Sequence, residues 1–278
     1  MNPRALALEP LSPTVGAAVL GAHPDQLLRD EEFPGWCLDA LERFGVLVFR
    51  QLNVDDMTQV AFSKRLGRVE TFGKGELPEI FRVTLDPAKN RAAEYLKGTV
   101  DWHIDGLTEP VPIMATLLSA HQVAPTGGET EFASTYAAYD DWTPDEQRRF
   151  ANTRVVHTFE ASQRLVTPNP SPEQLALWRK RAPMEHPLVW THRSGRRSLV
   201  LGATMDHVVG MGLDEGRSML GGLLEHATRP ERVYRHQWST GDLVIWDNRG
   251  VLHRVLPYDA ASGRDMHRTT LFGDEAIN

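Results

Sequence analysis

Residues 241–254 read GDLVIWDNRGVLHR. The Gly-Asp pair at 241–242 is typical of a turn, and the apolar residues 243–246 predict a buried strand. Residues 247–250 then predict a tight connection, after which His253 is presented on the next strand. The segment therefore predicts a strand-rich fold in which one histidine is held on extended backbone.

Comparable short runs, mostly bounded by Gly, Pro or Asp, recur along the chain. They predict strands at 45–50, 79–84, 113–123, 153–159, 186–192, 198–202, 233–238, 242–247, 251–256 and 266–272. Helical periodicity and capping residues predict helices at 30–44, 55–66, 143–151, 171–181 and 213–227. Many short strands without regular strand–helix alternation favour an α+β, mainly β fold, in which a sandwich or barrel is supported by helices.

The composition is that of an ordinary soluble globular protein, with 41% hydrophobic and 24% charged residues among 278. No internal repeat or linker interrupts the chain, so we expect a single domain over residues 1–278. The net charge of −7 disfavours a nucleic-acid partner. No apolar run approaches the ~20 residues needed to cross a membrane.

The cellular location is expected to be the cytoplasm. The N-terminal segment 1–10 lacks the continuous apolar stretch of a secretory signal. The single cysteine, Cys37, rules out an intramolecular disulfide framework. Phosphate-binding, dinucleotide-binding and serine-nucleophile motifs are also missing from the sequence.

A metal site is suggested by His103 and Asp105, which are separated by one residue. On a strand, side chains two residues apart project from the same face, so an imidazole and a carboxylate would converge. Such a pair alone is common by chance, but His253 far downstream offers a third ligand. Two histidines and one carboxylate on one face would leave Fe(II) three open positions. Arg264 and Arg268 follow, four residues apart, and would share one face of a strand.

These motifs together resemble the taurine dioxygenase/TfdA family of Fe(II)- and 2-oxoglutarate-dependent oxygenases. The resemblance is carried by Trp102-His103-x-Asp105, Gly127-Gly128-Glu129-Thr130, Trp246-Asp247-Asn248-Arg249 with His253, and Arg264-x-Met266-His267-Arg268-x-Thr270. Residues 45–50 and 65–68 add to it. The motifs occur in the order of the family and span most of the chain.

The resemblance implies a double-stranded β-helix (jelly-roll) core with flanking helices. It implies that His103, Asp105 and His253 are the iron ligands. It also implies that Thr130 and Arg264 hold the distal carboxylate of 2-oxoglutarate, which suits an arginine fork and a hydroxyl donor. The cofactor set would be Fe(II), with 2-oxoglutarate and O2 as co-substrates that yield succinate and CO2.

By the same resemblance, Arg268 would meet the anionic group of a small-molecule substrate. Taurine-type members carry a histidine shortly after the segment that matches 66–69, whereas residues 70–73 here read ETFG. We therefore expect taurine to be a poor substrate, and a carboxylate, sulfate ester or phosphonate to be better. Substrate determinants are expected in the irregular segments 70–100 and 160–172.

Two other functions are compatible with the same three ligands. One is hydrolysis or lyase chemistry with Zn(II), which leaves Thr130, Arg264 and Arg268 without a role. The other is a catalytically silent 2-oxoglutarate sensor. The family also implies that the chain could form a homo-oligomer.

Three further histidines need separate interpretations. His121 is interpreted as a core residue or as one beside the metal ligands. His157 is equally compatible with the pocket wall and with the core. His267 alternates with Arg268 and is expected to face outward or toward the helices.

Overall fold

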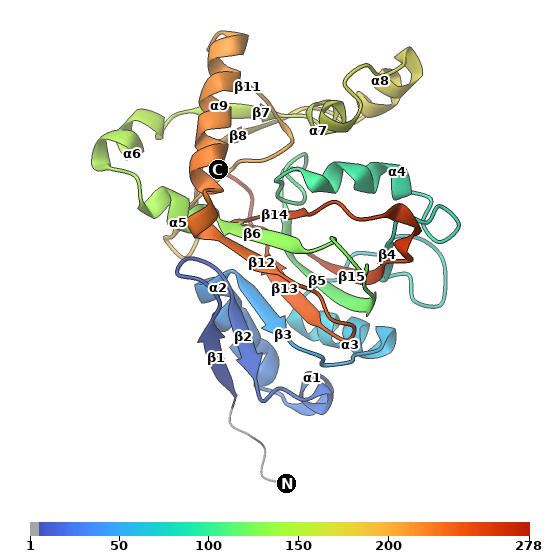
Figure 1. Ribbon diagram of the computed structural model, residues 1–278. Helices are drawn as coiled ribbons and strands as arrows, with labels where there is room; N and C mark the ends of the chain where they lie inside the picture. Colours follow the sequence, from blue (N-terminus) through green and yellow to red (C-terminus); the bar gives the residue numbers. More distant parts are fainter. Residues whose placement is uncertain (1–5) are drawn as a thin grey trace.

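The computed structural model describes residues 6–278, and its largest sheet has seven strands (Figure 1). Residues 1–5, part of the segment inspected for a secretory signal, lie outside the described range. In spatial order the strands are β1 (Ala7–Pro10), β2 (Ala17–Leu20), β3 (Val46–Phe49), β13 (Leu243–Asp247), β5 (Ile113–Gln122), β15 (Asp265–Phe272) and β4 (Phe81–Val83). All neighbours pair antiparallel except β2 with β3.

A smaller sheet faces this one and completes the jelly-roll core. It contains β12 (Val233–His236), β6 (Thr130–Ser134) and β14 (Val251–Val255). Apolar side chains from both sheets, among them Leu118, Phe132 and Trp246, form one cluster between them. Strands β13 and β14 lie in different sheets, so residues 248–250 carry the chain from one sheet to the other.

Helices cover the outer face of the large sheet (Figure 1). They are α1 (Pro24–Arg29), α2 (Phe33–Phe44) and α3 (Asp56–Leu66). The rings of Phe33, Phe49 and Phe62 are almost fully buried there, with Phe33 centred 6.4 Å from Phe49 and 5.8 Å from Phe62. Fully burying such a side chain stabilises the fold by about 1.5–3 kcal/mol.

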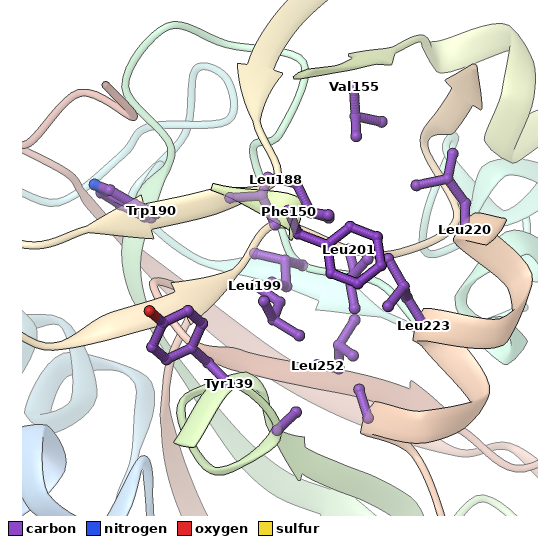
Figure 2. Close-up of a cluster of buried hydrophobic side chains, with 14 of the residues drawn as sticks. Tyr139, Phe150, Val155, Leu188, Trp190, Leu199, Leu201, Leu220, Leu223 and Leu252 are labelled. Carbon is purple, nitrogen blue, oxygen red and sulfur yellow. The ribbon is translucent and has the colours of Figure 1, made fainter. Parts of the chain in front are cut away.

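A further layer packs against the small sheet. It holds β7 (Arg154–His157), β8 (Met184–Pro187), β9 (Val189–Thr191), β10 (Arg197–Leu199), β11 (Met205–Val208) and the long helix α9 (Leu213–Ala227). Figure 2 shows the apolar cluster in which Leu220 and Leu223 of α9 meet Leu199, Leu201 and Leu252.

The remaining helices are short. They are α4 (Ala93–Leu96), η1 (Lys97–Val100), α5 (Thr135–Asp140), α6 (Pro144–Phe150), α7 (Phe159–Val166), α8 (Pro172–Trp178), η2 (Pro230–Arg232) and η3 (Ala260–Ser262). No helix within residues 6–278 is both long and apolar enough to cross a membrane.

The α+β, mainly β fold and all five predicted helices are confirmed, with shifts at their ends. The single strand predicted at 186–192 is wrong, because the chain breaks at Leu188 and the two halves pair in different sheets. The irregular loop expected at 160–172 is also partly wrong, since most of α7 lies in it. The Thr158 hydroxyl caps that helix by accepting a hydrogen bond from the Ala161 amide.

Buried histidines predict acid-sensitive stability. Burial lowers the pKa of His157 to about 3 and that of His192 to about 4. An unfolded chain binds protons on these residues near pH 6.5, whereas the folded chain does not. The free energy of unfolding should therefore fall as the pH drops below about 6.5, by about 1.4 kcal/mol per pH unit for each such histidine.

Urea unfolding between pH 7 and pH 5 checks this dependence. A His192→Gln variant should have a slope about one proton shallower than the parent. The control His207→Gln changes a partly exposed histidine, and its slope is compared with that of His192→Gln. Parallel curves for the parent and His192→Gln would contradict the assignment.

Candidate metal centre and its pockets

His103, Asp105 and His253 converge on one point, as the sequence predicts. Nε2 of His103 lies 3.8 Å from Oδ1 of Asp105, and Nε2 of His253 lies 3.9 Å from Oδ2. One ligand atom from each residue lies within 4.8 Å of the others. These are separations that one ion could bridge.

The backbone conformation that brings these three residues together differs from the predicted one. His253 does lie on β14, but His103 and Asp105 lie outside the regular strands. The amide of His103 donates to the carbonyl of His253 at 3.0 Å, and the reverse bond measures 2.9 Å. This isolated antiparallel bridge holds the two imidazoles together, with ring centroids 4.1 Å apart.

Neighbouring groups orient the ligand atoms as a metal site requires. Nδ1 of His103 is hydrogen-bonded to the Asp101 carbonyl at 2.8 Å, so its Nε2 stays free to face Asp105. The Thr116 hydroxyl donates to Asp105 at 3.4 Å, and Asn248 accepts the Asp105 amide at 3.4 Å. Asn248 also donates to Thr116 at 2.9 Å. The donor set and its outer partners therefore fit a divalent transition metal.

The ionisation of Asp105 and His253 also suits metal binding. Burial alone raises the pKa of Asp105, but the charges of His253, Arg268 and His103 outweigh it, so the pKa lies below its usual range. Burial, aided by the neighbouring His103, lowers the pKa of His253 to about 3. A carboxylate and a neutral imidazole are the forms that bind a metal.

One pocket lies beside this centre between the two sheets. Its lining includes five of the six predicted site residues: His103, Thr130, His253, Arg264 and Arg268. Apolar side chains, among them Val83, Leu118 and Val255, form other parts of its wall.

Arg264 is a buried cation without a neighbouring carboxylate in the described part of the chain. It is only 3% exposed, and within residues 6–278 no carboxylate lies within 4.0 Å of it. The Cβ of any residue replacing Gly128, where φ is +77°, would lie 3.1 Å from Arg264 Nε. Thr130 accepts a hydrogen bond from the Trp238 indole at 2.9 Å, which leaves its own O–H free to donate. A guanidinium and a hydroxyl at a buried position form a receptor for a carboxylate.

Arg268 lies nearer to the three candidate metal ligands. Its Nη1 is 3.8 Å from Asp105 Oδ2, and its guanidinium sits over the ring of Phe81 at 4.7 Å. Glu70 occupies the region where taurine-type members carry a histidine. Burial raises the pKa of Glu70, partly offset by the charge of Arg268. The positive charge of Arg268 therefore interacts with two carboxyl groups, those of Asp105 and Glu70.

A second pocket lies on the Asp105 side of the centre, and His103 lines both pockets. Its wall includes Tyr95 from α4 and Phe159 from α7, whose rings are centred 5.8 Å apart. The Arg181 guanidinium covers Phe159 at 4.2 Å. Residues from both segments expected to hold substrate determinants, 70–100 and 160–172, line this pocket.

Other motif residues support the scaffold. The partly buried Arg249 forms an ion pair at 2.8 Å with the buried Asp247, and it also lies 2.9 Å from Glu42. His157 is buried and hydrogen-bonded to Thr204 at 2.9 Å. His121 is solvent-exposed at the outer end of β5, so its interpretation as a core residue is wrong. Thr116 and Asn248 were missed as site residues, although Asn248 lies inside a quoted motif.

Two imidazoles and a carboxylate on a jelly-roll core, beside a buried arginine, are the arrangement typical of mononuclear non-haem metalloenzymes. Comparison with known proteins identifies the family. The family model "Taurine catabolism dioxygenase TauD, TfdA family" matches residues 7–270. The chain belongs to this TauD/TfdA family. It is accordingly an oxidoreductase of the 2-oxoglutarate-dependent dioxygenase class.

Individual relatives are similar over nearly their full lengths. The α-ketoglutarate-dependent 2,4-dichlorophenoxyacetate dioxygenase of Burkholderia sp. (strain RASC) is 35% identical, with 92% of this chain and 89% of the relative covered. The α-ketoglutarate-dependent sulfate ester dioxygenase of Pseudomonas putida is 32% identical, covering 99% and 93%. The crystal structure of AAD-2 in complex with Mn(II) and N-oxalylglycine matches with a TM-score of 0.83 at 32% identity, covering 99% and 100%.

Proposed function

We propose that this enzyme binds Fe(II) through His103, Asp105 and His253, and 2-oxoglutarate through Thr130 and Arg264. The observation that carries the proposal is the buried Arg264, which has no carboxylate within 4.0 Å among residues 6–278 and lies in the pocket that both histidines line. Iron bound there would supply the redox chemistry that couples decarboxylation of 2-oxoglutarate by O2 to oxidation of a substrate C–H bond.

The protein residues would orient the co-substrate and exclude water. Arg264 and Thr130 are placed to hold the distal carboxylate, which leaves the keto acid end directed toward the metal ligands. The apolar walls at Val83, Leu118 and Val255 keep the pocket poor in water, and this strengthens the charge interactions inside it.

We propose a small anionic substrate with an apolar body. Its anionic group would face Arg268 in the first pocket, and its body would extend past His103 to Tyr95 and Phe159 in the second. Two relatives act, by name, on 2,4-dichlorophenoxyacetate and on sulfate esters, which are both anions. Carboxylates and sulfate esters are therefore the first classes to assay, followed by phosphonates.

An anaerobic titration of the Fe(II)-loaded protein with 2-oxoglutarate tests the cofactor assignment. We expect a visible metal-to-ligand charge-transfer band that saturates with 2-oxoglutarate. Bound iron without such a band would contradict the proposal and favour the hydrolase. A band without succinate release from any anion of the panel would favour the silent sensor.

Taurine is expected to be turned over at least about tenfold more slowly than the best carboxylate or sulfate ester. The physical reason is that Glu70 supplies a carboxylate where a sulfonate needs a donor, and a missing charge-assisted hydrogen bond costs about 1.5–3 kcal/mol. Succinate release measured with each compound checks this prediction, with a reaction lacking substrate as the control. A taurine rate equal to that of the best substrate would contradict it.

We also propose that the enzyme acts in the cytoplasm on free small molecules. The net charge of −7 supports the expectation that nucleic acid is not a partner. Cys37 is buried in α2, and burial raises the pKa of its thiol to about 12, which keeps it unreactive. Labelling with a thiol reagent should therefore require unfolding of the chain.

A further inference from the structure

A second cluster of metal-ligating side chains lies on the opposite face of the large sheet from Arg268. Asp56 is the first residue of α3, His121 lies near the end of β5, and His267 lies within β15. One ligand atom from each residue lies within 4.8 Å of the others. Because side chains alternate along β15, His267 faces α3 while Arg268 faces the active-site pocket.

His267 is held between two carboxylates. Its Nδ1 lies 2.6 Å from Asp56 Oδ1, and its Nε2 lies 3.6 Å from Asp265 Oδ1. Nε2 is buried and finds no hydrogen-bond partner in the described part of the chain. A neutral imidazole carries a single N–H, so it can donate to only one of these two carboxylates. A cation bound at Nδ1 would let Nε2 carry the proton toward Asp265, the arrangement usual for metal-bound histidines.

His121 completes the donor set from the solvent side. Its ring stacks on that of His267, with centroids 3.7 Å apart and planes 21° from parallel, and its Nε2 is 3.5 Å from Asp56 Oδ1. Its side chain is 33% exposed, which leaves a route for an ion from solvent. Burial, and then the charge of His267, lowers the pKa of His121 and favours the neutral form that binds a metal.

The surrounding charges keep Asp265 in an outer role. Its carboxylate is already paired with Arg82 and Lys89. Asp56 has no lysine or arginine within 4.0 Å among residues 6–278, so its carboxylate is free to bind an ion. The inner donors are thus two imidazole nitrogens and one carboxylate oxygen.

We propose that Asp56, His121 and His267 form a second divalent metal site, distinct from the catalytic centre and suited to Zn²⁺ or a similar transition metal. Imidazole donors favour such ions over Mg²⁺ and Ca²⁺, and water would complete the coordination. An ion here would tie α3 to β5 and to β15, the strand that carries Arg268. Binding would therefore stabilise the fold by mass action.

The test isolates this site in a His103→Ala/His253→Ala background, which removes two catalytic ligands. Zn²⁺ is the probe, and its stoichiometry and affinity are measured by competition with a chromophoric chelator. We expect one Zn²⁺ per chain and a rise in Tm on addition of Zn²⁺. Adding His121→Ala should weaken binding by at least about tenfold and abolish the rise in Tm.

Two further variants keep the result interpretable. Asp56→Asn preserves the size of the side chain but removes its charge, and it should weaken Zn²⁺ binding as His121→Ala does. The matched control His207→Ala removes a partly exposed histidine that is paired with Asp206, away from this cluster, and it should leave binding unchanged. Absence of Zn²⁺ binding in the folded background protein would overturn the proposal. Equal binding with and without His121 would overturn it as well.

Discussion

Replacing His103 by alanine is expected to reduce 2-oxoglutarate-dependent succinate formation by at least about a thousandfold. Its Nε2 is free, faces Asp105 and is oriented by the hydrogen bond to the Asp101 carbonyl. Loss of one of three ligands would remove the ion. Metal catalysis lowers the activation free energy by several kcal/mol, and a loss of about 4 kcal/mol corresponds to about a thousandfold in rate.

The measurement is succinate release with added Fe(II), together with the anaerobic charge-transfer band, which should disappear in His103→Ala. The variant His207→Ala, which changes a partly exposed histidine outside the site, is the control and should keep both signals. The fold should persist, because the side chain lies at a pocket wall and His103 bonds to His253 through the backbone. Activity of His103→Ala within tenfold of the parent would exclude His103 as a ligand.

Replacing Arg264 by alanine is expected to raise the 2-oxoglutarate concentration needed for half-maximal rate by about thirtyfold or more. Arg264 is a buried guanidinium with no carboxylate within 4.0 Å among residues 6–278, so a bound dicarboxylate would be its charge partner. Truncating one member of a buried charge pair costs about 2–5 kcal/mol, and the lower bound corresponds to about thirtyfold.

An Arg264→Lys variant should lie between the parent and Arg264→Ala, because lysine keeps the charge but lacks the planar fork. Arg235→Ala serves as the matched control, since Arg235 is a half-exposed arginine paired with Glu131 on the small sheet. Its dependence on 2-oxoglutarate should match that of the parent. An unchanged requirement in Arg264→Ala, with the charge-transfer band still present, would place the distal carboxylate elsewhere.

The sequence was sufficient to predict features that depend on neighbouring residues. The strands predicted at 242–247 and 251–256 are confirmed as β13 and β14, and the capping residues near 143 and 171 do begin helices. The family was also predictable, because four separate motifs keep their order along the chain. Local patterning and motif order are properties that residues carry before any folding.

The pairing of distant segments required the tertiary structure. The sequence suggested that His103 and Asp105 would converge on a regular strand, but a backbone bridge to His253 holds them instead. The break at Leu188 likewise depends on which sheet each half joins. Thr116 was missed because a lone threonine in a strand has no local signature, and its role arises from contact with Asp105.

The two metal clusters illustrate the same division. The sequence by itself predicted the candidate catalytic ligands, and its motifs determined the family and with it the class of enzyme. Only the tertiary structure brought Asp56, His121 and His267 together, since they come from a helix and two strands far apart in the chain. The physical reason is that side-chain alternation fixes the face on which a residue lies, whereas packing between sheet and helix decides what it meets there.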